Sequence, residues 1–367
     1  MKESNPGDLV FVAMSGGVDS SLAALLLKEQ GYNVVGATLK LWEHDVDSQA
    51  ATESVCCTLE SINDARTVCY QIGAAHYVFD FRREFENHVI SNFTSEYQNG
   101  RTPYPCAICN RQIKWKALWQ KISGLGGKFI ATGHYARVRY DKTSDRFQIL
   151  KGKDSTKDQS YALWGLSQKD LSQTLFPLGE MTKAETRTMA RKYNLKTAGK
   201  PDSQELCFIP NDDLAGFFKK RGNGSVRPGP IFKTTGEVLG EHKGLPFYTV
   251  GQRKGIGIAA GKPLYVSRID PSENSVYLDE GPGLLKTEFT ISNLNWVSIS
   301  APVKEIACQL KLRYQHKPVG GTIFPAEEGI SKVVLDQPEK AITPGQSAVF
   351  YSRDILWGGG IIEKIGN

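Results

Sequence analysis

The sequence lacks any long run of apolar residues. Its first hydrophobic segment, LVFVAM at residues 9–14, is too short for a signal peptide and far too short to cross a membrane. Internal repeats and low-complexity segments are absent as well. We therefore expect an ordinary globular, cytoplasmic protein with no membrane partner.

Cysteine is scarce and irregularly spaced. The seven cysteines are an odd number, spread through 367 residues without the dense, regular spacing of a secreted disulfide scaffold. We therefore expect reduced thiols.

Neither sign of charge dominates the composition. The 45 Lys and Arg residues exceed the 39 Asp and Glu residues by enough to give a net charge of +6. This mild excess is compatible with a polyanionic partner but does not require one. The length and the 40% hydrophobic content allow a sizeable core divided among two or three domains.

The first half of the chain alternates between two kinds of segment. Short apolar runs predict strands at residues 9–14, 33–42, 76–81 and 128–138. Helical spacing predicts helices at residues 21–31, 61–73, 82–97 and 110–122. Strand and helix in alternation indicate a parallel sheet with helices on both faces.

The composition and the lengths of the segments change after about residue 212. Glycine and proline become frequent, and short strand-like pieces such as PFYTV, PLYVSRI and SVYLDE follow, bounded by turn residues. From about residue 287 the chain continues as short strands, a pattern typical of small β domains or a barrel. We predict an α/β domain at residues 1–212, a small central, mostly β domain at 213–284 and a β domain at 285–367.

A glycine loop, SGGVDSS, lies where the first strand ends and the first helix begins. Gly16 and Gly17 allow backbone N–H groups to approach a phosphate, and the helix dipole favours its negative charge. Asp19 is placed either to cap the helix or to hold a magnesium ion. The loop is neither a Walker loop, because it has no lysine, nor a GxGxxG turn. A glycine turn with a capping aspartate and no ligand is the plainer alternative.

Two thiols, Cys106 and Cys109, stand in YPCAICNRQIKW, and Cys207 stands in the polar, turn-rich segment PDSQELCFIP. We expect Cys109 to open a helix, where the dipole and the following Arg111 and Lys114 would lower its thiol pKa. The alternative for each cysteine is a small buried hydrophobic residue.

A structural zinc site is less favoured for these thiols. Such a site usually takes four protein ligands, and Cys56–Cys57 is not a second C-x-x-C pair.

The loop SGGVDSS resembles the PP-loop of the N-type ATP pyrophosphatases, which split ATP between the α and β phosphates and transfer AMP to a carbonyl oxygen. With it, an ordered set of blocks resembles the tRNA-uridine 2-sulfurtransferases, the MnmA or TrmU thiouridylases, over essentially the whole chain. The blocks are GRTPYPCAICNRQIKW, ATGHYAR, KDQSYAL, DSQELCFI, YTVGQRKGIGI and PGQSAVFY. The resemblance implies a PP-loop domain, a small central domain and a C-terminal β-barrel. It also implies 2-thiolation of the wobble uridine in tRNAs for lysine, glutamate and glutamine.

The resemblance also implies the site residues. Those expected at ATP, which would act with magnesium, are Ala13, Met14, Ser15, Gly16, Gly17, Val18, Asp19, Ser20, Leu39 and Gly133. Those expected at the tRNA are Tyr104, Pro105, Cys106, His134, Lys157, Asp158, Gln159, Arg313, Tyr314 and Gln346. Taken singly, the charged and polar members are equally well explained as solvated surface residues, and His134 as a structural residue.

In the mechanism that the resemblance implies, a cysteine desulfurase or a sulfur-relay protein loads Cys207 with a persulfide. Cys109 is the nucleophile that releases its sulfur, and a cellular reductant reopens the resulting disulfide. Some family members carry aspartate where this chain has Cys106. An alternative is therefore a [4Fe-4S] cluster held by Cys106, Cys109 and Cys207.

Two other classes of protein stay open at this point. One is a PP-loop ligase that transfers nitrogen to a small metabolite, which would have no use for the paired thiols or the barrel. The other is a non-catalytic RNA-binding protein with a decayed ATP site, against which the intact SGGVDSS loop argues.

Overall fold

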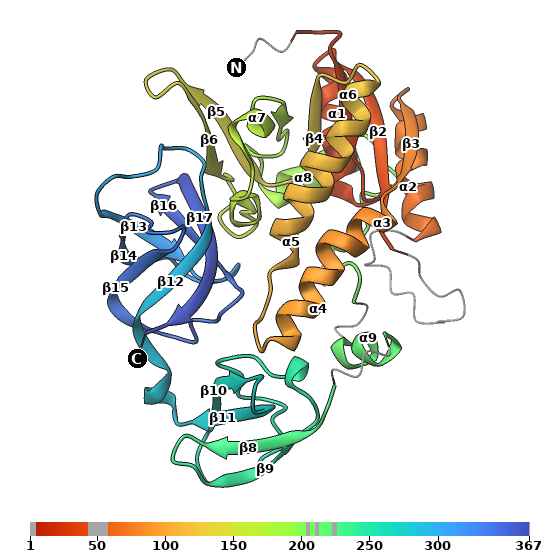
Figure 1. Cartoon of the computed structure of the whole chain (residues 1–367). Coiled ribbons are helices and arrows are strands. Elements are labelled where there is room, and N and C mark those ends of the chain that lie inside the picture. The colour runs from red at the N-terminus through yellow and green to blue at the C-terminus, as the bar shows by residue number, and fades with distance from the viewer. Residues whose placement is uncertain (1–4, 43–57, 203–205, 210–212, 222–225, 367) are drawn as a thin grey trace.

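The computed structural model describes residues 5–42, 58–202, 206–209, 213–221 and 226–366. Predictions about Cys56 and Cys57, and the predicted boundary at residue 212, lie outside these residues. Figure 1 shows three parts: an α/β part, a small part built around two strand pairs, and a barrel of long strands. The predicted fold class is confirmed.

The α/β part is built on a parallel sheet with the strand order β3-β2-β1-β4-β7. Its strands are β1 (Leu9–Ala13), β2 (Asn33–Lys40), β3 (Ala75–Asp80), β4 (Phe129–Thr132) and β7 (Thr174–Leu175). The central strand β1 is apolar on both faces: Phe11 packs into one hydrophobic cluster, and Val10 and Val12 pack into another. Successive side chains of a strand point to opposite faces, so one short run supplies two cores.

Helices cover this sheet as predicted. Those in contact with its strands include α1 (Val18–Glu29) and α2 (Leu59–Gln71), and α8 (Lys183–Lys192) packs against α1. Two shorter helices, α7 (Gln168–Leu171) and α9 (Leu214–Lys220), follow along the chain. The predicted helix at 82–97 is a continuous run of α3 (Arg82–Phe85), η1 (Glu86–Ile90) and α4 (Ser91–Gln98), in which η1 is π-helical. Among the described helices, none combines the length and the apolar character that a membrane crossing needs.

The helix that carries the paired cysteines begins earlier than predicted. It runs from α5 (Pro105–Ile108) through the π-helical η2 (Cys109–Leu118) into α6 (Trp119–Gly124). Tyr104 is its N-cap, and Pro105 takes the first helical position because proline has no N–H to leave unpaired. The prediction that Cys109 opens the helix is therefore wrong: Cys106 lies in the first turn, and Cys109 follows it.

The predicted strand at 128–138 is two strands in two sheets. β4 ends at Thr132, and after a short connection β5 (Ala136–Asp141) pairs with β6 (Arg146–Lys151) as an antiparallel hairpin. β6 in turn pairs with the barrel strand β17 (Ile355–Ile365). The apolar run alone could not reveal this break, because both halves suit a buried strand.

The barrel and the central part are antiparallel for the most part. The barrel strands are β12 (Leu285–Trp296), β13 (Ile306–Lys311), β14 (Val319–Ile323), β15 (Ser331–Lys340), β16 (Ser347–Ser352) and β17 (Ile355–Ile365). Pairing of β12 with both β15 and β17 closes them into a barrel. The central strands are β8 (Gly229–Lys233), β9 (Val238–His242), β10 (Tyr265–Asp270) and β11 (Ser275–Asp279). The predicted strand PFYTV instead begins as a 3-10 turn, Leu245–Phe247.

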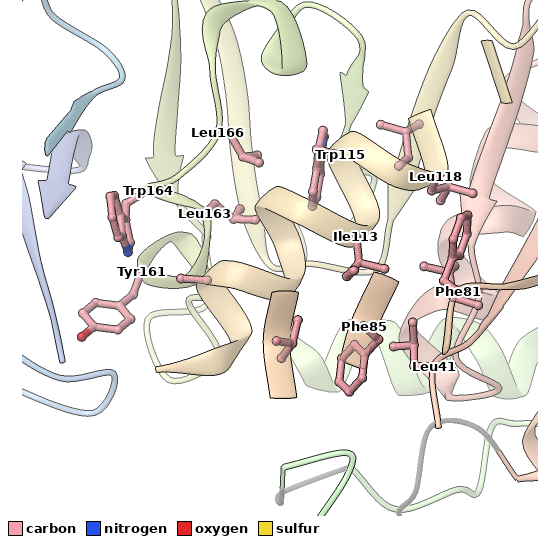
Figure 2. Close-up of a cluster of buried hydrophobic side chains, with 14 of the residues drawn as sticks. Leu41, Phe81, Phe85, Ile113, Trp115, Leu118, Tyr161, Leu163, Trp164 and Leu166 are labelled. Atoms are coloured by element: carbon pink, nitrogen blue, oxygen red, sulfur yellow. The ribbon is translucent and has the colours of Figure 1, made fainter. Parts of the chain in front are cut away.

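A buried seam joins the barrel to the α/β part. Tyr161 donates a hydrogen bond to the Ser347 carbonyl (2.7 Å), and Trp164 Nε1 donates one to Ser347 Oγ (3.0 Å). In Figure 2 both side chains lie toward the barrel, at one end of a hydrophobic cluster that continues past Trp115 and Ile113. A Cβ added at Gly359 would lie 2.8 Å from the Trp164 ring, so the indole fits only against glycine.

Trp164→Ala should lower the free energy of unfolding by about 3–5 kcal/mol, because it empties the space that the buried indole fills. Ser347→Ala removes only the hydrogen bond to the indole and should cost about 1 kcal/mol. Urea unfolding followed by circular dichroism measures both losses. Equal losses would contradict a seam held mainly by packing of the indole.

Candidate active site

The glycine loop connects β1 to α1 at the carboxyl edge of the parallel sheet. Gly16 has a φ of +72°, and a Cβ there would lie 2.3 Å from the Ser61 carbonyl oxygen of α2. Gly17 is the N-cap of α1, and no described side chain caps that helix end. The first N–H groups of α1 are therefore available to an anion, and the helix dipole favours one there.

Gly133 brings the end of β4 against the start of α1. A Cβ at this position would lie 2.7 Å from the Asp19 carbonyl carbon and 2.7 Å from the Ser20 nitrogen. Only glycine permits this approach of two backbones. The structure thus brings Gly133 together with the loop, as the resemblance implies.

Asp19 does not cap the helix, so that alternative is wrong. Its carboxylate accepts hydrogen bonds from Lys183 Nζ at 2.7 and 2.8 Å, and the Tyr135 hydroxyl lies 2.8 Å from Oδ1. The burial of Tyr135 and the neighbouring Asp19 raise the pKa of this phenol, so it stays a hydrogen-bond donor.

Lys183 makes a second ion pair, 2.9 Å long, with Asp202. Asp202 also pairs with Lys157 (2.9 Å) and Arg187 (2.6 Å). Burial raises the pKa of Asp202, but hydrogen bonds and charge interactions with Lys157 and Lys183 outweigh it and lower that pKa to about 2. Lys183 therefore joins the glycine loop to the segment that leads to Cys207.

Sequence reasoning missed Lys183, Tyr135 and Asp202. A signal for Lys183 was present: Thr182 and Glu185 form a capping box, which places Lys183 at the first position of α8. The Lys183 side chain reaches Asp19 because α8 packs against α1, and a local sequence pattern does not predict how two helices pack.

The remaining residues expected at ATP lie in or beside the loop. Ala13 ends β1, and the Met14 N–H donates a hydrogen bond to the Ala37 carbonyl of the neighbouring strand (2.9 Å). Leu39 is only 7% exposed, in β2, and belongs to the main hydrophobic cluster. Its contact with a nucleotide remains a prediction.

Residues 157–159 of the KDQ block have internal partners. The Gln159 side chain accepts a hydrogen bond from the Tyr135 N–H (3.0 Å). Asp158 is buried and accepts hydrogen bonds from the N–H groups of Gly152 and Ser160 (both 3.1 Å). These contacts hold the chain between β6 and the seam, so the block has a structural role in addition to the predicted RNA contact.

Three tyrosine rings pack together near Cys106. The rings of Tyr104 and Tyr314 are stacked with centroids 6.3 Å apart, and Tyr161 meets Tyr104 edge to face at 5.1 Å. Burial, with the nearby Asp158 and Cys106, raises the pKa of Tyr314 to about 12. Lys311 Nζ lies 5.9 Å from the Tyr314 ring centroid and is a cation that sequence reasoning missed.

Gln346 and Arg313 differ in their surroundings. The Gln346 side chain donates hydrogen bonds to the carbonyls of Thr102 (2.9 Å) and Pro103 (3.2 Å), and so fastens the barrel to the segment before Cys106. Arg313 is exposed. A sequence pattern could not distinguish these two environments.

His134 packs among aromatic rings. Its ring centroid lies 6.0 Å from that of Trp115 and 6.1 Å from that of Phe176, and its Nδ1 lies 2.7 Å from Thr132 Oγ1. Burial, and then the charge of Lys114, lower the pKa of His134 well below its usual value. It is therefore a neutral imidazole near pH 7.

The described cysteines fall into two groups. Cys69 and Cys308 are buried, and burial raises their pKa values to about 11 and about 12. Cys106 is exposed, whereas Cys109 and Cys207 are half-buried and pack against the same hydrophobic cluster. The protein thus keeps the three thiols of the candidate site accessible and the other two inert.

The described residues fit some of the implied groups and not others. The uncapped start of α1 and the close approach at Gly133 fit the phosphates of ATP. Asp19 is the carboxylate at the loop, but magnesium there would compete with Lys183. No three His, Cys, Asp or Glu side chains of the described residues are grouped as metal ligands, so Cys106, Cys109 and Cys207 are not assembled for an iron-sulfur cluster.

The fold and the loop define an α/β nucleotide-binding domain. A family model described as a tRNA methyl transferase HUP domain matches residues 8–211. A PRC-barrel domain of the same family matches residues 216–280, and an aminomethyltransferase β-barrel domain matches residues 286–362.

Curated relatives identify the family more closely. A protein of Carboxydothermus hydrogenoformans named tRNA-specific 2-thiouridylase MnmA is 46% identical, over 97% of this chain and 97% of the relative. Proteins with the same name are 44% identical in Acetivibrio thermocellus, over 96% of this chain and 99% of the relative, and 44% identical in Clostridium botulinum, over 97% and 98%. The chain belongs to the tRNA-specific 2-thiouridylase family, a family of PP-loop enzymes.

Gly133→Ala should weaken ATP binding by about tenfold, because a Cβ forced against the start of α1 costs about 1–3 kcal/mol. Titration calorimetry with a non-hydrolysable ATP analogue measures the affinity. The control is Gly124→Ala in α6, where an added Cβ meets nothing within 4 Å. Unchanged affinity in Gly133→Ala would contradict the placement of ATP at this loop.

Asp202→Asn should flatten the dependence of stability on acid pH. The pKa of Asp202 is lowered from 3.8 to about 2 in the folded protein, so its contribution is complete above about pH 4 and is lost as the pH falls toward 2. The full contribution is about 2 kcal/mol. Urea unfolding at a series of pH values gives the free energy of unfolding against pH for wild type and variant. Parallel curves for the two proteins would refute the ionic network.

Proposed function

We propose that the protein catalyses the ATP-dependent 2-thiolation of a uridine in tRNA. The observation that supports this best is the ionic bridge from the glycine loop to the Cys207 segment. Lys183 binds Asp19 in the loop and also Asp202, which precedes Cys207. The bridge fixes Asp202, which lies five residues before Cys207 in the sequence, to the loop at which ATP would bind.

The finer parts of the proposal follow the family resemblance. The target is the wobble uridine of tRNAs for lysine, glutamate and glutamine. Residues 1–212 carry the chemistry, residues 213–284 form the central domain, and residues 285–367 hold the anticodon region.

Adenylation is the first step. The O2 oxygen of the uridine attacks the α-phosphate of ATP, and pyrophosphate leaves. Residues 13–20 line the phosphates, where N–H groups at the start of α1 stabilise the developing negative charge. Leu39 and Gly133 complete the nucleotide pocket, and a magnesium ion bound with ATP would neutralise charge on the phosphates. The step converts a poor leaving group, an oxo oxygen, into AMP.

Sulfur transfer is the second step. A cysteine desulfurase or a sulfur-relay protein first loads Cys207 with a persulfide. The Cys109 thiolate attacks the Cys207 sulfur, hydrosulfide leaves and adds to C2 of the uridine, and AMP departs with the O2 oxygen. The resulting disulfide between Cys109 and Cys207 is reopened by two electrons from a cellular reductant.

The tRNA contacts of the proposal combine aromatic and basic groups. The target base leaves the stack and meets the segment Tyr104, Pro105 and Cys106, where the stacked tyrosine rings suit a flipped base. The further tRNA contacts are His134, Lys157, Asp158, Gln159, Arg313, Tyr314 and Gln346.

An anaerobic thiolation assay with three cysteine variants tests the mechanism. Cys207→Ala and Cys109→Ala should abolish 2-thiouridine, because each removes one partner of the sulfur-transfer pair. Cys106→Ala should retain part of the activity, because in this route the Cys106 thiol takes no covalent step. Mass spectrometry of digested tRNA measures the product, and iron content is measured on the same samples.

The assay also separates the alternatives. If all three variants are inactive and the wild type works only with iron bound, a cluster replaces the persulfide route. If pyrophosphate release is as fast without tRNA as with it, a nitrogen ligase acting on a small metabolite replaces the tRNA enzyme. If wild type supplied with a sulfur donor forms no 2-thiouridine, the protein is a non-catalytic RNA-binding protein.

A further inference from the structure

A basic, exposed loop of the central part begins close to the segment that leads to Cys106. We call residues 251–262, GQRKGIGIAAGK, the central loop; they contain three cations and no acidic residue. Together with Pro263, Leu264 and Leu278, residues of this loop line a hollow of about 630 Å³. None of the site residues named above belongs to it.

The central loop is held in shape by apolar anchors. Ile256 is buried in the core of the central part, and Ile258 packs against the same core. Between and beside them, Gly255 and Gly257 have φ values of +74° and +82° and are exposed. Alternation of anchored isoleucines with outward glycines leaves the backbone itself at the surface, where N–H groups can reach a phosphate.

The charged side chains of the loop are available to a partner. Arg253 and Lys254 are exposed and form no ion pair with any described residue. Lys262 is exposed and lies 3.6 Å from Glu280. This surface ion pair is long and weak, so a phosphate can take the place of the Glu280 carboxylate. Exposed cations, two of them without an ionic partner among the described residues, suit a chain of phosphates better than a buried small ligand.

The base of the loop touches both other parts of the protein. Thr249 Oγ1 lies 3.2 Å from Thr102 Oγ1, in the segment that leads to Cys106. A Cβ at Gly251 would lie 2.3 Å from the Ala341 Cβ of the barrel segment. The Gln252 side chain accepts a hydrogen bond from the Thr249 N–H (2.9 Å) and donates one to the Lys254 carbonyl (3.0 Å), which fixes the turn.

We propose that the central loop binds the ribose-phosphate backbone of the tRNA whose target base lies at Cys106. The inference rests on the proposed function, because it places on the loop a neighbouring stretch of the same RNA. Its contacts are to phosphate, so they position the substrate and carry no base preference.

The test uses Arg253→Ala/Lys254→Ala in the full chain and an unmodified lysine tRNA transcript. Filter binding over a range of potassium chloride concentrations gives the slope of log Kd against log salt. Removing two phosphate contacts should reduce that slope by about two and raise Kd several-fold at low salt. Arg253→Lys/Lys254→Arg keeps both charges and should keep the slope.

The matched control is Arg191→Ala/Lys192→Ala, which removes two exposed cations at the end of α8. It should bind tRNA with the wild-type slope. An unchanged slope in the loop variant, or an equal loss in the control, overturns the inference.

The failure of the proposed function gives a different result. In that case wild type forms no 2-thiouridine, whatever the slopes are. If wild type thiolates tRNA and the loop variant keeps the wild-type salt slope, the proposed role of the central loop is wrong and the proposed function stands. Thermal unfolding of each variant confirms that it is folded.

Discussion

The seam between the barrel and the α/β part is the constraint on which the rest of the site depends. Tyr161 and Trp164 project from one part into the other and end on the same residue, Ser347. Because Tyr161 is fixed there, Tyr104 and Tyr314 from different parts can stack beside Cys106. The stacked pair of rings thus exists only when the two parts are docked, since neither part supplies both rings alone.

The second organising interaction is electrostatic. Lys183 is 11% exposed and lies between two carboxylates, Asp19 and Asp202, which would repel each other without it. The lysine is therefore paired inside the protein with carboxylates from two segments that are far apart in the sequence. Any anion or cation that arrives at Asp19 changes the balance that holds Asp202, so the glycine loop and the Cys207 segment share one set of charges.

Sequence patterns predict the features of this fold that short segments determine by themselves. The apolar run of β1, the glycine turn and the later change to short strands gave the parallel sheet, the loop and the β parts correctly. Apolar spacing alone places the start of the cysteine helix too late, although Pro105 marks its first helical position. The same spacing does not show the break at Gly133, because the runs on both sides of it are apolar. Lys183, Tyr135 and Lys311 depend on contacts between distant segments, which periodicity does not encode.

The hairpin of β5 and β6 belongs by sequence to the α/β part and by hydrogen bonding to the barrel sheet. A fragment ending near residue 212 would therefore carry an uncovered strand edge in β6, together with Trp164 and Tyr161 stripped of their partners. Such an edge invites pairing with other chains. The boundary between the α/β part and the barrel is thus clear in the sequence, whereas in the structure strand pairing crosses it.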